Sequence, residues 1–583
     1  MTRPSPKPLD VLAQNGSEVE RIKDQSHYLR GTLVESFANP LTGSISADDH
    51  QLIKFHGTYE QDDRDRRLER QERKLEPAYA FMIRLRLPGG DLTAQQWQTC
   101  HAISEQYGDK SFRLTTRQAI QFHGIIKFDL KKTIQAMHQS LLDSIAGCGD
   151  VNRNVVCAPD PALSSLHAQV YPWASKVSEH LLPQSRAYHE IWLDEPRGQG
   201  RTRVAGGDEA IVEPLYGRHY LPRKFKVGIA IPPHNEVDVH SNDVGVIAIA
   251  DGEKLAGFNI VVGGGLGMTF GREDTYARLA SDIGFCTPEQ LLDTVYHIVA
   301  IQRDFGNRQD RRLSRLKYTI DQYGLDWLRQ ELTERCGFEL QPARAVIFTT
   351  TGDRFGWSQT LDGRWHLGLR LEYGRVVDTG NQRIKTALLE IAQTAVCGFR
   401  VTPNQNLLLT GVEETDKAGI EAILKAHGYA VDASHLSGLR RNSIACVALN
   451  TCPQAMAEAE RYLPTLINRL EPILDRYGLL QDEIKIRMTG CPNGCGRSVM
   501  AEIGLIGKSP GRYNLYLGGA FNGERLNTLY RENLDEAGIL AALEPVLADY
   551  ADQRKKGESF GDFARRREYV QRDAGGIEYV PTT

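Results

Sequence analysis

Two short stretches of the chain alternate apolar and polar residues with the period of a β-strand. They read FMIRLRL at 81–87 and HLGLRLEYG at 366–374. Each is followed by a stretch with helical spacing, at 93–107 and 383–396, and then by a second strand-like stretch. Strand, helix and strand in so short a space predict a small α+β unit that occurs twice.

The two units share sequence as well as pattern. Residues 112–125 read FRLTTRQAIQFHGI, and residues 399–412 read FRVTPNQNLLLTGV. Five residue types recur in register: Phe112/Phe399, Arg113/Arg400, Thr115/Thr402, Gln118/Gln405 and Gly124/Gly411. Two further matches follow in the same order: VNRNVVC at 151–157 with LRRNSIAC at 439–446, and GFNIVVGGG at 257–265 with RYNLYLGGA at 512–520. The chain is therefore predicted to be two diverged halves, with a ligand site at their interface.

This repeat predicts an α+β fold with a pseudo-twofold axis and four folded units. The small, ferredoxin-like units are expected at 76–145 and 345–430, and the larger α/β units at 150–340 and 435–583. All four units are expected to surround a central cofactor site.

The first 75 residues are expected to form an extended lead segment. It ends in a dense charge run, EQDDRDRRLERQERKLE, at 60–76. Such a run is either a solvated helix or a docking surface for a partner chain.

Composition excludes several functional classes. A chain of 583 residues is too long for one core, and a formal net charge of −4 gives no nucleic-acid signature. No apolar run approaches the roughly 20 residues that a membrane span needs, and the N-terminus has no secretory signal. We therefore expect a cytoplasmic protein without a membrane partner, in which the ten cysteines stay reduced.

Four of the cysteines form two close pairs, Cys446 with Cys452 and Cys491 with Cys495. Four thiolates suit either a structural zinc ion or a 4Fe-4S cluster. The five residues inside the first pair make it loose for a zinc knuckle, so the spacing favours the cluster. The other six are expected to be small buried hydrophobic residues: Cys100, Cys148, Cys157, Cys286, Cys336 and Cys397.

Basic residues are concentrated in the first half. The repeat copy there carries Arg113 and Arg117, whereas the second copy keeps only Arg400. Alternation in RKFKVGIAI places Lys224 and Lys226 on one face of a strand, which is unfavourable unless solvent or an anion lies between them. A further basic run, RQDRRLSRLKY at 308–318, is predicted to be a solvated helix surface. The glycine stretch VVGGGLG at 261–267 lacks the G-x-G-x-x-G spacing of a dinucleotide site.

These motifs together resemble one known family. SIACVALNTCP and TGCPNGCGRS closely resemble the cluster motif of sirohaem-dependent sulfite and nitrite reductases. LRLPGG, FRLTTRQAIQFHG, NRNVVC, YLPRKFK and GFNIVVGGGLG resemble the same family in the same order. The resemblance covers nearly all of residues 20–570 and is strongest to the haemoprotein subunits of NADPH-dependent assimilatory sulfite reductases. One departure is Asn450, which stands where many members have proline.

The resemblance implies a role for each matching residue. The ligands of the 4Fe-4S cluster would be Cys446, Cys452, Cys491 and Cys495, and Cys495 would also bridge the cluster to the sirohaem iron. The substrate anion would be bound by Arg84, Arg153, Lys224 and Lys226. The sirohaem would be lined by Arg113, Thr115, Arg117, Gln121, His123, Gly263, Gly264 and Gly265.

The implied activity is the six-electron reduction of sulfite to sulfide, which needs such cofactors because no side chain supplies electrons. The chain has no recognisable flavin or nicotinamide motif, so an NADPH-oxidising flavoprotein partner is expected, with ferredoxin as the alternative donor. Two other interpretations remain at this point. One is a sirohaem nitrite reductase, and the other is a zinc-stapled binding protein without redox activity.

Overall fold

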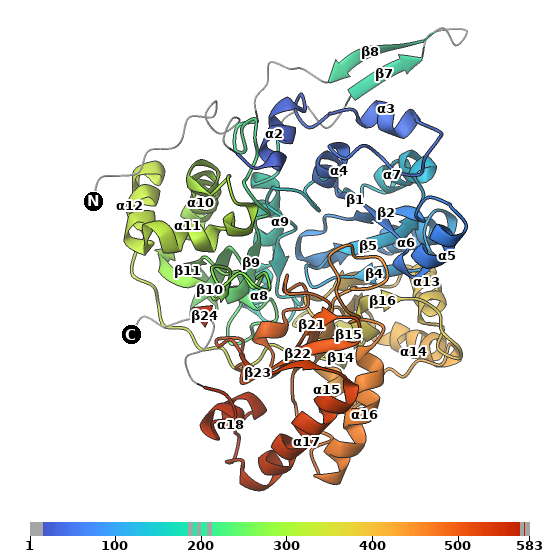
Figure 1. Ribbon diagram of the computed structural model, residues 1–583. Coiled ribbons are helices and arrows are strands. Elements are labelled where there is room, and N and C mark those ends of the chain that lie inside the picture. Colours follow the sequence, from blue (N-terminus) through green and yellow to red (C-terminus); the bar gives the residue numbers. More distant parts are fainter. Residues whose placement is uncertain (1–15, 185–189, 195–199, 207–212, 572–575, 578–583) are drawn as a thin grey trace.

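The computed structural model describes residues 16–184, 190–194, 200–206, 213–571 and 576–577. Four five-stranded sheets form its framework, two small and two large. Figure 1 shows the two small sheets beside each other, with the large sheets of the first and second halves against them. This arrangement confirms the predicted α+β class.

The first small sheet has the order β1-β2-β5-β4-β16. Its strands are β1 (Thr58–Asp62), β2 (Tyr79–Arg84), β5 (Ile120–Ile125), β4 (Phe112–Leu114) and β16 (Arg375–Val376). The second has the order β14-β15-β18-β17-β3. Its strands are β14 (Gly356–Gln359), β15 (Trp365–Leu369), β18 (Leu407–Val412), β17 (Gly398–Val401) and β3 (Asp91–Leu92). The helices of these units are α6 (Ala94–Gln106), α7 (Leu130–Gln139), α13 (Ile384–Thr394) and α14 (Lys417–Ala426).

The two small units exchange an edge strand. β16 of the second half pairs with β4 of the first, and β3 of the first half pairs with β17 of the second. The exchange fixes the two repeat copies side by side. Between them, the indole of Trp97 stacks on Phe399 at 4.7 Å and meets Phe112 edge-on at 5.2 Å. The repeated phenylalanines therefore pack in one shared core.

The large sheets have matching topologies. The first has the order β13-β11-β10-β9-β6 and the second β19-β20-β21-β22-β23. In each sheet, the first three strands along the chain are parallel neighbours. The next two strands join them through antiparallel pairing. The strands of the first are β6 (Val156–Cys157), β9 (Val227–Ala230), β10 (Val244–Asp251), β11 (Lys254–Val262) and β13 (Ser281–Cys286). Those of the second are β19 (Ser443–Ala445), β20 (Ile486–Thr489), β21 (Ile503–Ser509), β22 (Arg512–Leu517) and β23 (Thr528–Leu534).

Helices cover the large sheets. In the first half they are α8 (Ser165–Val170), α9 (Trp173–His180), α10 (Leu291–Phe305), α11 (Leu316–Tyr323) and α12 (Leu325–Cys336). In the second half they are α15 (Gly438–Arg441), α16 (Leu463–Arg476), α17 (Glu536–Gln553) and α18 (Phe560–Arg566). None of the helices in the described ranges is long and apolar enough to cross a bilayer.

The lead segment is not extended where the structure describes it. Residues 18–72 form α2 (Glu18–Gln25), α3 (Leu33–Ala38), α4 (Asp49–Leu52), β1 and α5 (Arg67–Glu72). β1 is a strand of the first small sheet, and Phe55 lies in the core with 2% of its surface exposed. The predicted boundary at residue 75 is therefore wrong, because β1 belongs to the unit that follows it. Residues 1–15 lie outside the described residues.

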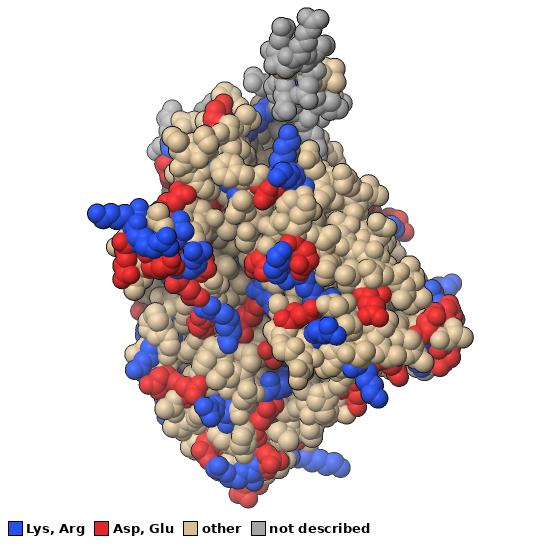
Figure 2. Space-filling model, turned by 90° about the vertical axis from the view of Figure 1, so that its right-hand side faces the viewer, with Lys and Arg blue, Asp and Glu red and all other residues tan. Residues whose placement is uncertain are grey.

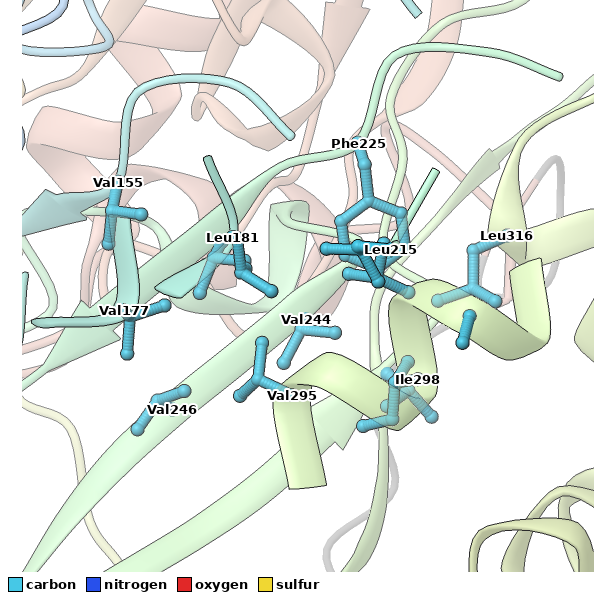
Figure 3. Close-up of a cluster of buried hydrophobic side chains, with 14 of the residues drawn as sticks. Val155, Val177, Leu181, Leu215, Phe225, Val244, Val246, Val295, Ile298 and Leu316 are labelled. Atoms are coloured by element: carbon cyan, nitrogen blue, oxygen red, sulfur yellow. The ribbon is translucent and has the colours of Figure 1, made fainter. Parts of the chain in front are cut away.

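The core of the first large unit lies beneath the predicted anion site. Figure 3 shows Phe225 directed into this core toward Leu215 and Leu316. Phe225 is fully buried and separates Lys224 from Lys226 along the chain. Because neighbouring side chains in an extended segment point to opposite sides, burial of Phe225 turns both lysines toward the other side.

Candidate active site

The four paired cysteines lie at the carboxyl ends of two neighbouring parallel strands. Cys446 directly follows β19, and Cys491 follows β20 after Gly490. The two loops are joined, because Gly490 N donates to Cys446 Sγ at 3.3 Å and its carbonyl accepts from Ala457 N at 3.1 Å. Asn493 Nδ2 donates to Cys491 Sγ at 3.3 Å. Hydrogen bonds of this kind to sulfur are typical of iron–sulfur sites.

The thiols influence one another electrostatically, which places them in one site. Burial raises the pKa of Cys446 well above its usual value, and Cys495, Cys491 and Cys452 raise it further. Burial and Cys495 raise the pKa of Cys491 to about 11. Such thiols need a nearby cation to ionise, and a metal cluster supplies it. Within the described residues no three His, Cys, Asp or Glu side chains are gathered closely enough to hold one metal ion.

The two loops that carry the paired cysteines are together called the cluster loop. This cluster loop of the second half contacts the glycine stretch 261–267 of the first half, called the glycine loop. Met268 N donates to Pro492 O at 3.0 Å, and Gly494 packs directly on Leu266. From the first repeat copy, Thr116 Oγ1 donates to Cys495 O at 3.2 Å. The site is thus built at the interface of the two halves, as the repeat predicted.

The four residues predicted to bind the substrate anion lie on the Cys495 side of this interface. The Cys495 thiol lies close enough to Arg84, Lys224 and Lys226 to affect their pKa values. Arg153 repels Lys224 and is therefore near it. Within the described residues none of these four cations forms an ion pair with a carboxylate. Four unpaired cations around one half-buried space are unfavourable without an anion.

The two lysines have strongly lowered pKa values. Burial, followed by repulsion from Arg223 and Arg315, lowers the pKa of Lys224 to about 7, against a partial offset from Cys495. Burial and the positive charge of Lys224 hold the pKa of Lys226 well below its usual value. A bound oxyanion would reverse the effect of the neighbouring cations and recharge both amines.

Arg84 and Arg153 are held by backbone carbonyls, which leave part of each guanidinium free for a ligand. Arg153 donates to Gly149 O at 2.8 Å, and Arg84 Nη1 donates to Gly147 O at 3.3 Å. With its amide turned to satisfy both groups, Gln121 Oε1 accepts from Arg84 Nη2 at 2.6 Å. The predicted cofactor residue Gln121 therefore orients a predicted substrate residue.

The remaining residues of the first repeat copy have different environments. Arg113 is buried and bonded to Glu460 Oε2 at 2.6 Å and Ala445 O at 2.8 Å, so it braces the start of the cluster loop. Thr115 Oγ1 accepts from Arg117 N at 3.2 Å and shapes the turn. Arg117 Nη2 donates to Val227 O at 2.8 Å, while its Nε is buried without a partner in the described ranges.

His123 offers a free acceptor toward the site. Its Nδ1 lies 3.2 Å from Gln61 Oε1, and its Nε2 is buried with no partner among the described residues. Burial, with Arg375 and Arg113, lowers the pKa of His123 well below its usual value, so the ring is neutral. The unpartnered Nε–H donor of Arg117, next to cations that have no carboxylate partner among the described residues, fits a ligand with several carboxylates, as sirohaem has.

The glycine stretch after β11 is held closely by its surroundings. Gly263 has a φ of +84°, and a Cβ on Gly264 would lie 2.2 Å from His240 O. Lys317 Nζ donates to Gly265 O at 3.1 Å. Only glycine permits this path of the backbone at Gly264, because a Cβ there would clash with the backbone of His240.

Several residues of the site were not predicted from the sequence. Tyr59 on β1 lies close enough to Arg153 for that cation to oppose the rise of its pKa by burial, and Cys148 accepts from Arg84 Nη1 at 3.1 Å. Arg223 repels Lys224 and could have been predicted, since it belongs to the same RKFK motif. Tyr59 and Cys148 carried no signal, because their partners are distant in the sequence.

Comparison with known proteins agrees with this geometry. The description "Nitrite and sulphite reductase 4Fe-4S domain" matches residues 173–340. The description "Nitrite/Sulfite reductase ferredoxin-like half domain" matches twice, at residues 73–140 and 358–427. The first match covers the larger unit of the first half, whereas the paired cysteines lie in its repeat in the second half.

Curated relatives cover nearly the whole chain. The sulfite reductase (NADPH) hemoprotein beta-component of Shouchella clausii is 53% identical over 97% of each chain, and that of Lysinibacillus sphaericus is 54% identical over 97% of each. The equivalent from Bacillus subtilis is 52% identical over the same share. The fold matches the structure of the Mycobacterium tuberculosis NirA protein with a TM-score of 0.77 at 22% identity, covering 96% of this chain and 98% of that one. The chain belongs to the nitrite and sulphite reductase family, among the sulfite reductase (NADPH) hemoprotein beta-components.

Proposed function

We propose that this chain reduces sulfite to sulfide with six electrons, at a sirohaem joined to a 4Fe-4S cluster. The electrons come from an NADPH-oxidising flavoprotein partner. One observation carries the proposal above all others. Four cations that have no carboxylate partner in the described part of the chain lie together, three of them near Cys495, the one exposed member of the four paired cysteines.

The cations would hold the oxygens of sulfite. Arg84 and Arg153 present planar donors suited to two oxygens at once, whereas Lys224 and Lys226 present compact charges. Backbone carbonyls and Gln121 fix the arginines before substrate arrives. Donors already in place cost no reorganisation while charge develops on the departing oxygens.

The lysines would also supply protons. Each oxygen of sulfite must leave as water, and this requires repeated protonation. Lys224 has a pKa lowered to about 7, mainly by burial, so it can give up a proton near neutral pH. An arginine cannot do this, because its guanidinium stays protonated.

The remaining roles concern the cofactors. Cys446, Cys452, Cys491 and Cys495 would hold the cluster, and Cys495 would join it to the sirohaem. When bound, the two groups supply the electron transfer that side chains cannot provide. Arg117, His123 and the loop Gly263–Gly265 would bind and orient the sirohaem, while Arg113 supports the cluster loop through Ala445 O.

The charged segment that contains α5 is our candidate docking surface for the flavoprotein. Arg64 Nη1 donates to Cys452 O at 3.1 Å and Ala455 O at 2.7 Å, and Arg461 Nη1 bonds to Asp65 at 2.6 Å. The segment thus lies against the cluster loop, where electrons would enter. Figure 2 shows basic and acidic groups in small mixed patches on the side of the molecule where α5 and α13 lie in Figure 1.

Charge reversal tests this surface. Arg66 and Arg73 are exposed at the two ends of α5, so their replacement by glutamate leaves the core intact. We expect lower sulfite reduction with NADPH and the flavoprotein, and unchanged reduction with an artificial dye. Lys556→Glu, on an exposed loop after α17, is the matched control. Equal NADPH-driven rates in all variants would place docking elsewhere, and activity with reduced ferredoxin would favour the alternative donor.

A visible absorption spectrum with iron and acid-labile sulfide analysis tests the cofactor assignment. We expect a strongly coloured chain that contains sirohaem and four cluster irons. A colourless protein with bound zinc would support a binding protein instead. Preference for nitrite over sulfite in kcat/KM would identify a nitrite reductase.

A further inference from the structure

Two loops that carry proposed substrate residues run side by side. Leu221 N donates to Asp150 O at 3.0 Å, and Phe225 N donates to Val151 O at 3.1 Å. Arg153 N then donates back to Phe225 O at 2.9 Å. The first loop ends in Arg153 and the second contains Lys224, so the pairing of the loops sets the separation of these two cations.

A buried cluster of charges ties the same loops together at Asp150. Arg311 Nη2 donates to Asp150 Oδ1 at 2.7 Å, and Arg311 Nη1 donates to Pro222 O at 3.1 Å. Lys23 Nζ lies 3.8 Å from Asp150 Oδ2 and donates to Leu221 O at 2.9 Å. Both cations therefore connect the carboxylate of one loop to the backbone of the other.

This cluster cannot itself bind substrate. The side chain of Lys23 is fully buried, and that of Asp150 is 6% exposed. Lys23 is also paired with Glu20 on its own helix, α2. Burial alone would raise the pKa of Asp150, but Arg311 and Lys23 lower it below its usual range, so the carboxylate is charged. Its bond to Arg311 is short, and Arg311 and Lys23 each also bond to the backbone of the second loop.

We infer that Asp150 is a positioning residue for sulfite reduction, which fixes Arg153 relative to Lys224 through Arg311 and Lys23. The inference rests on the proposed function and adds residues that do not touch substrate. It assigns two segments a role in the site: helix α2 from the lead segment, and the basic run at 308–318. A misplacement of about 1 Å at a reacting centre can cost on the order of 100-fold in rate.

The test compares Asp150→Asn with the wild-type enzyme loaded with both cofactors. We expect normal sirohaem and iron content and a fall of about tenfold or more in kcat/KM for sulfite. Most of the loss should lie in KM, because the displaced cations hold the anion before the reaction begins. Arg311→Lys keeps the charge but lacks the second guanidinium nitrogen, so one ammonium must replace the two nitrogens that reach Asp150 and Pro222 O, and its KM should lie between those of wild type and Arg311→Met.

Lys385→Met is the matched control. Lys385 is 4% exposed and bonds to Glu105 and Lys110 O between α13 and α6, away from the anion site. It should lose stability without a change in KM for sulfite. If Asp150→Asn does not fold, the Arg311 series decides. Unchanged KM in Arg311→Met, or equal losses in the control, would overturn the inference. Failure of the wild type to reduce sulfite would instead refute the proposed function.

Discussion

At the residue scale, Lys226 is the position that best separates sulfite from nitrite. Sulfite is a dianion when fully deprotonated and has three oxygens, whereas nitrite is a monoanion with two. Loss of one cation from a desolvated site should cost the dianion more, since Coulomb energy scales with charge. Lys226 has no carboxylate partner among the described residues, so its charge is available to the ligand.

Lys226→Asn should therefore lower kcat/KM for sulfite by about tenfold or more. A charge-assisted hydrogen bond contributes about 1.5–3 kcal/mol net, and each 1.4 kcal/mol is about tenfold in rate. Nitrite turnover should fall less or rise. Both anions are measured with the same dye donor. Equal proportional losses would mean that Lys226 does not discriminate between them.

Lys224 should control the alkaline side of the pH profile. Its pKa, lowered to about 7 mainly by burial, means that the free enzyme loses the ammonium as pH rises above that value. We expect kcat/KM to fall with rising pH in wild type. In Lys224→Arg, which stays charged but cannot donate a proton, kcat/KM should be lower overall and its fall should move to higher pH. Ionisation of sulfite itself affects wild type and variant equally, so it cannot cause a difference between their pH profiles. Superimposable profiles would exclude Lys224 as the titrating group.

Replacement of the four paired cysteines by serine is predicted to affect cluster iron in every case, but the sirohaem spectrum in only one. Cys446→Ser, Cys452→Ser and Cys491→Ser should each lose cluster iron and at least about 100-fold in activity. Mutation of residues that only hydrogen-bond to metal ligands already lowers metal affinity or activity by about 10–100-fold. Cys495→Ser should also change the sirohaem spectrum. Iron analysis and absorption spectra distinguish these outcomes. A Cys495→Ser enzyme that binds sirohaem with an unaltered spectrum would argue against a shared ligand.

At the element scale, the lead segment differs most from its prediction. Its charge run suggested a separate arm, but β1 pairs with β2, and Phe55 meets Tyr220 edge-on at 5.0 Å. Deletion of residues 1–60, which a separate docking arm would tolerate, should therefore destroy the fold. The sequence could not reveal this, because the partners of Phe55 and Lys23 lie up to about 200 residues away.

Phe55→Ala tests this placement directly. Truncation of a buried phenylalanine costs about 3–5 kcal/mol, so the free energy of unfolding should fall by that amount in denaturant titrations. Leu41→Ala, at a side chain that is 90% exposed, is the control and should change stability by less than about 0.5 kcal/mol. Similar stability of the two variants would contradict a core position for Phe55.

The basic run at 308–318 was predicted to be a solvated helix, and this is wrong. Arg308, Arg315 and Lys317 are buried and bond to Glu20, Asp243 and Gly265 O respectively. Local charge density cannot distinguish a solvated run from one with distant acidic partners. By contrast, strand alternation is a local pattern and the repeat needs only a comparison of the two halves, so both could predict the sheets.

At the scale of the whole molecule, the duplication has produced two halves with different chemistry. The large sheets share strand order, yet only the second half carries the paired cysteines and the first half carries all four of the cations proposed to bind the anion. The site requires both halves, because the glycine loop of one contacts the cluster loop of the other. Separate expression of the halves would therefore not give an active enzyme.

The chain should depend on a partner for electrons from NADPH. It carries no dinucleotide motif, since its glycine stretch lacks the required spacing. The isolated chain, loaded with cofactors, should not oxidise NADPH, and addition of the flavoprotein should restore NADPH-driven sulfite reduction. Absorbance of NADPH follows both reactions. NADPH oxidation by the chain alone would show a nucleotide site that we have not recognised.

The most direct test of the central claim is the yield of sulfide from sulfite by the isolated chain with a reduced dye. The account predicts sulfide as the main product, with six electrons consumed for each sulfide formed. It also predicts that Cys495→Ser, in which the proposed link between the cofactors is removed, forms almost none. Consumption of dye without sulfide, or equal sulfide from Cys495→Ser, would contradict reduction of sulfite at this site.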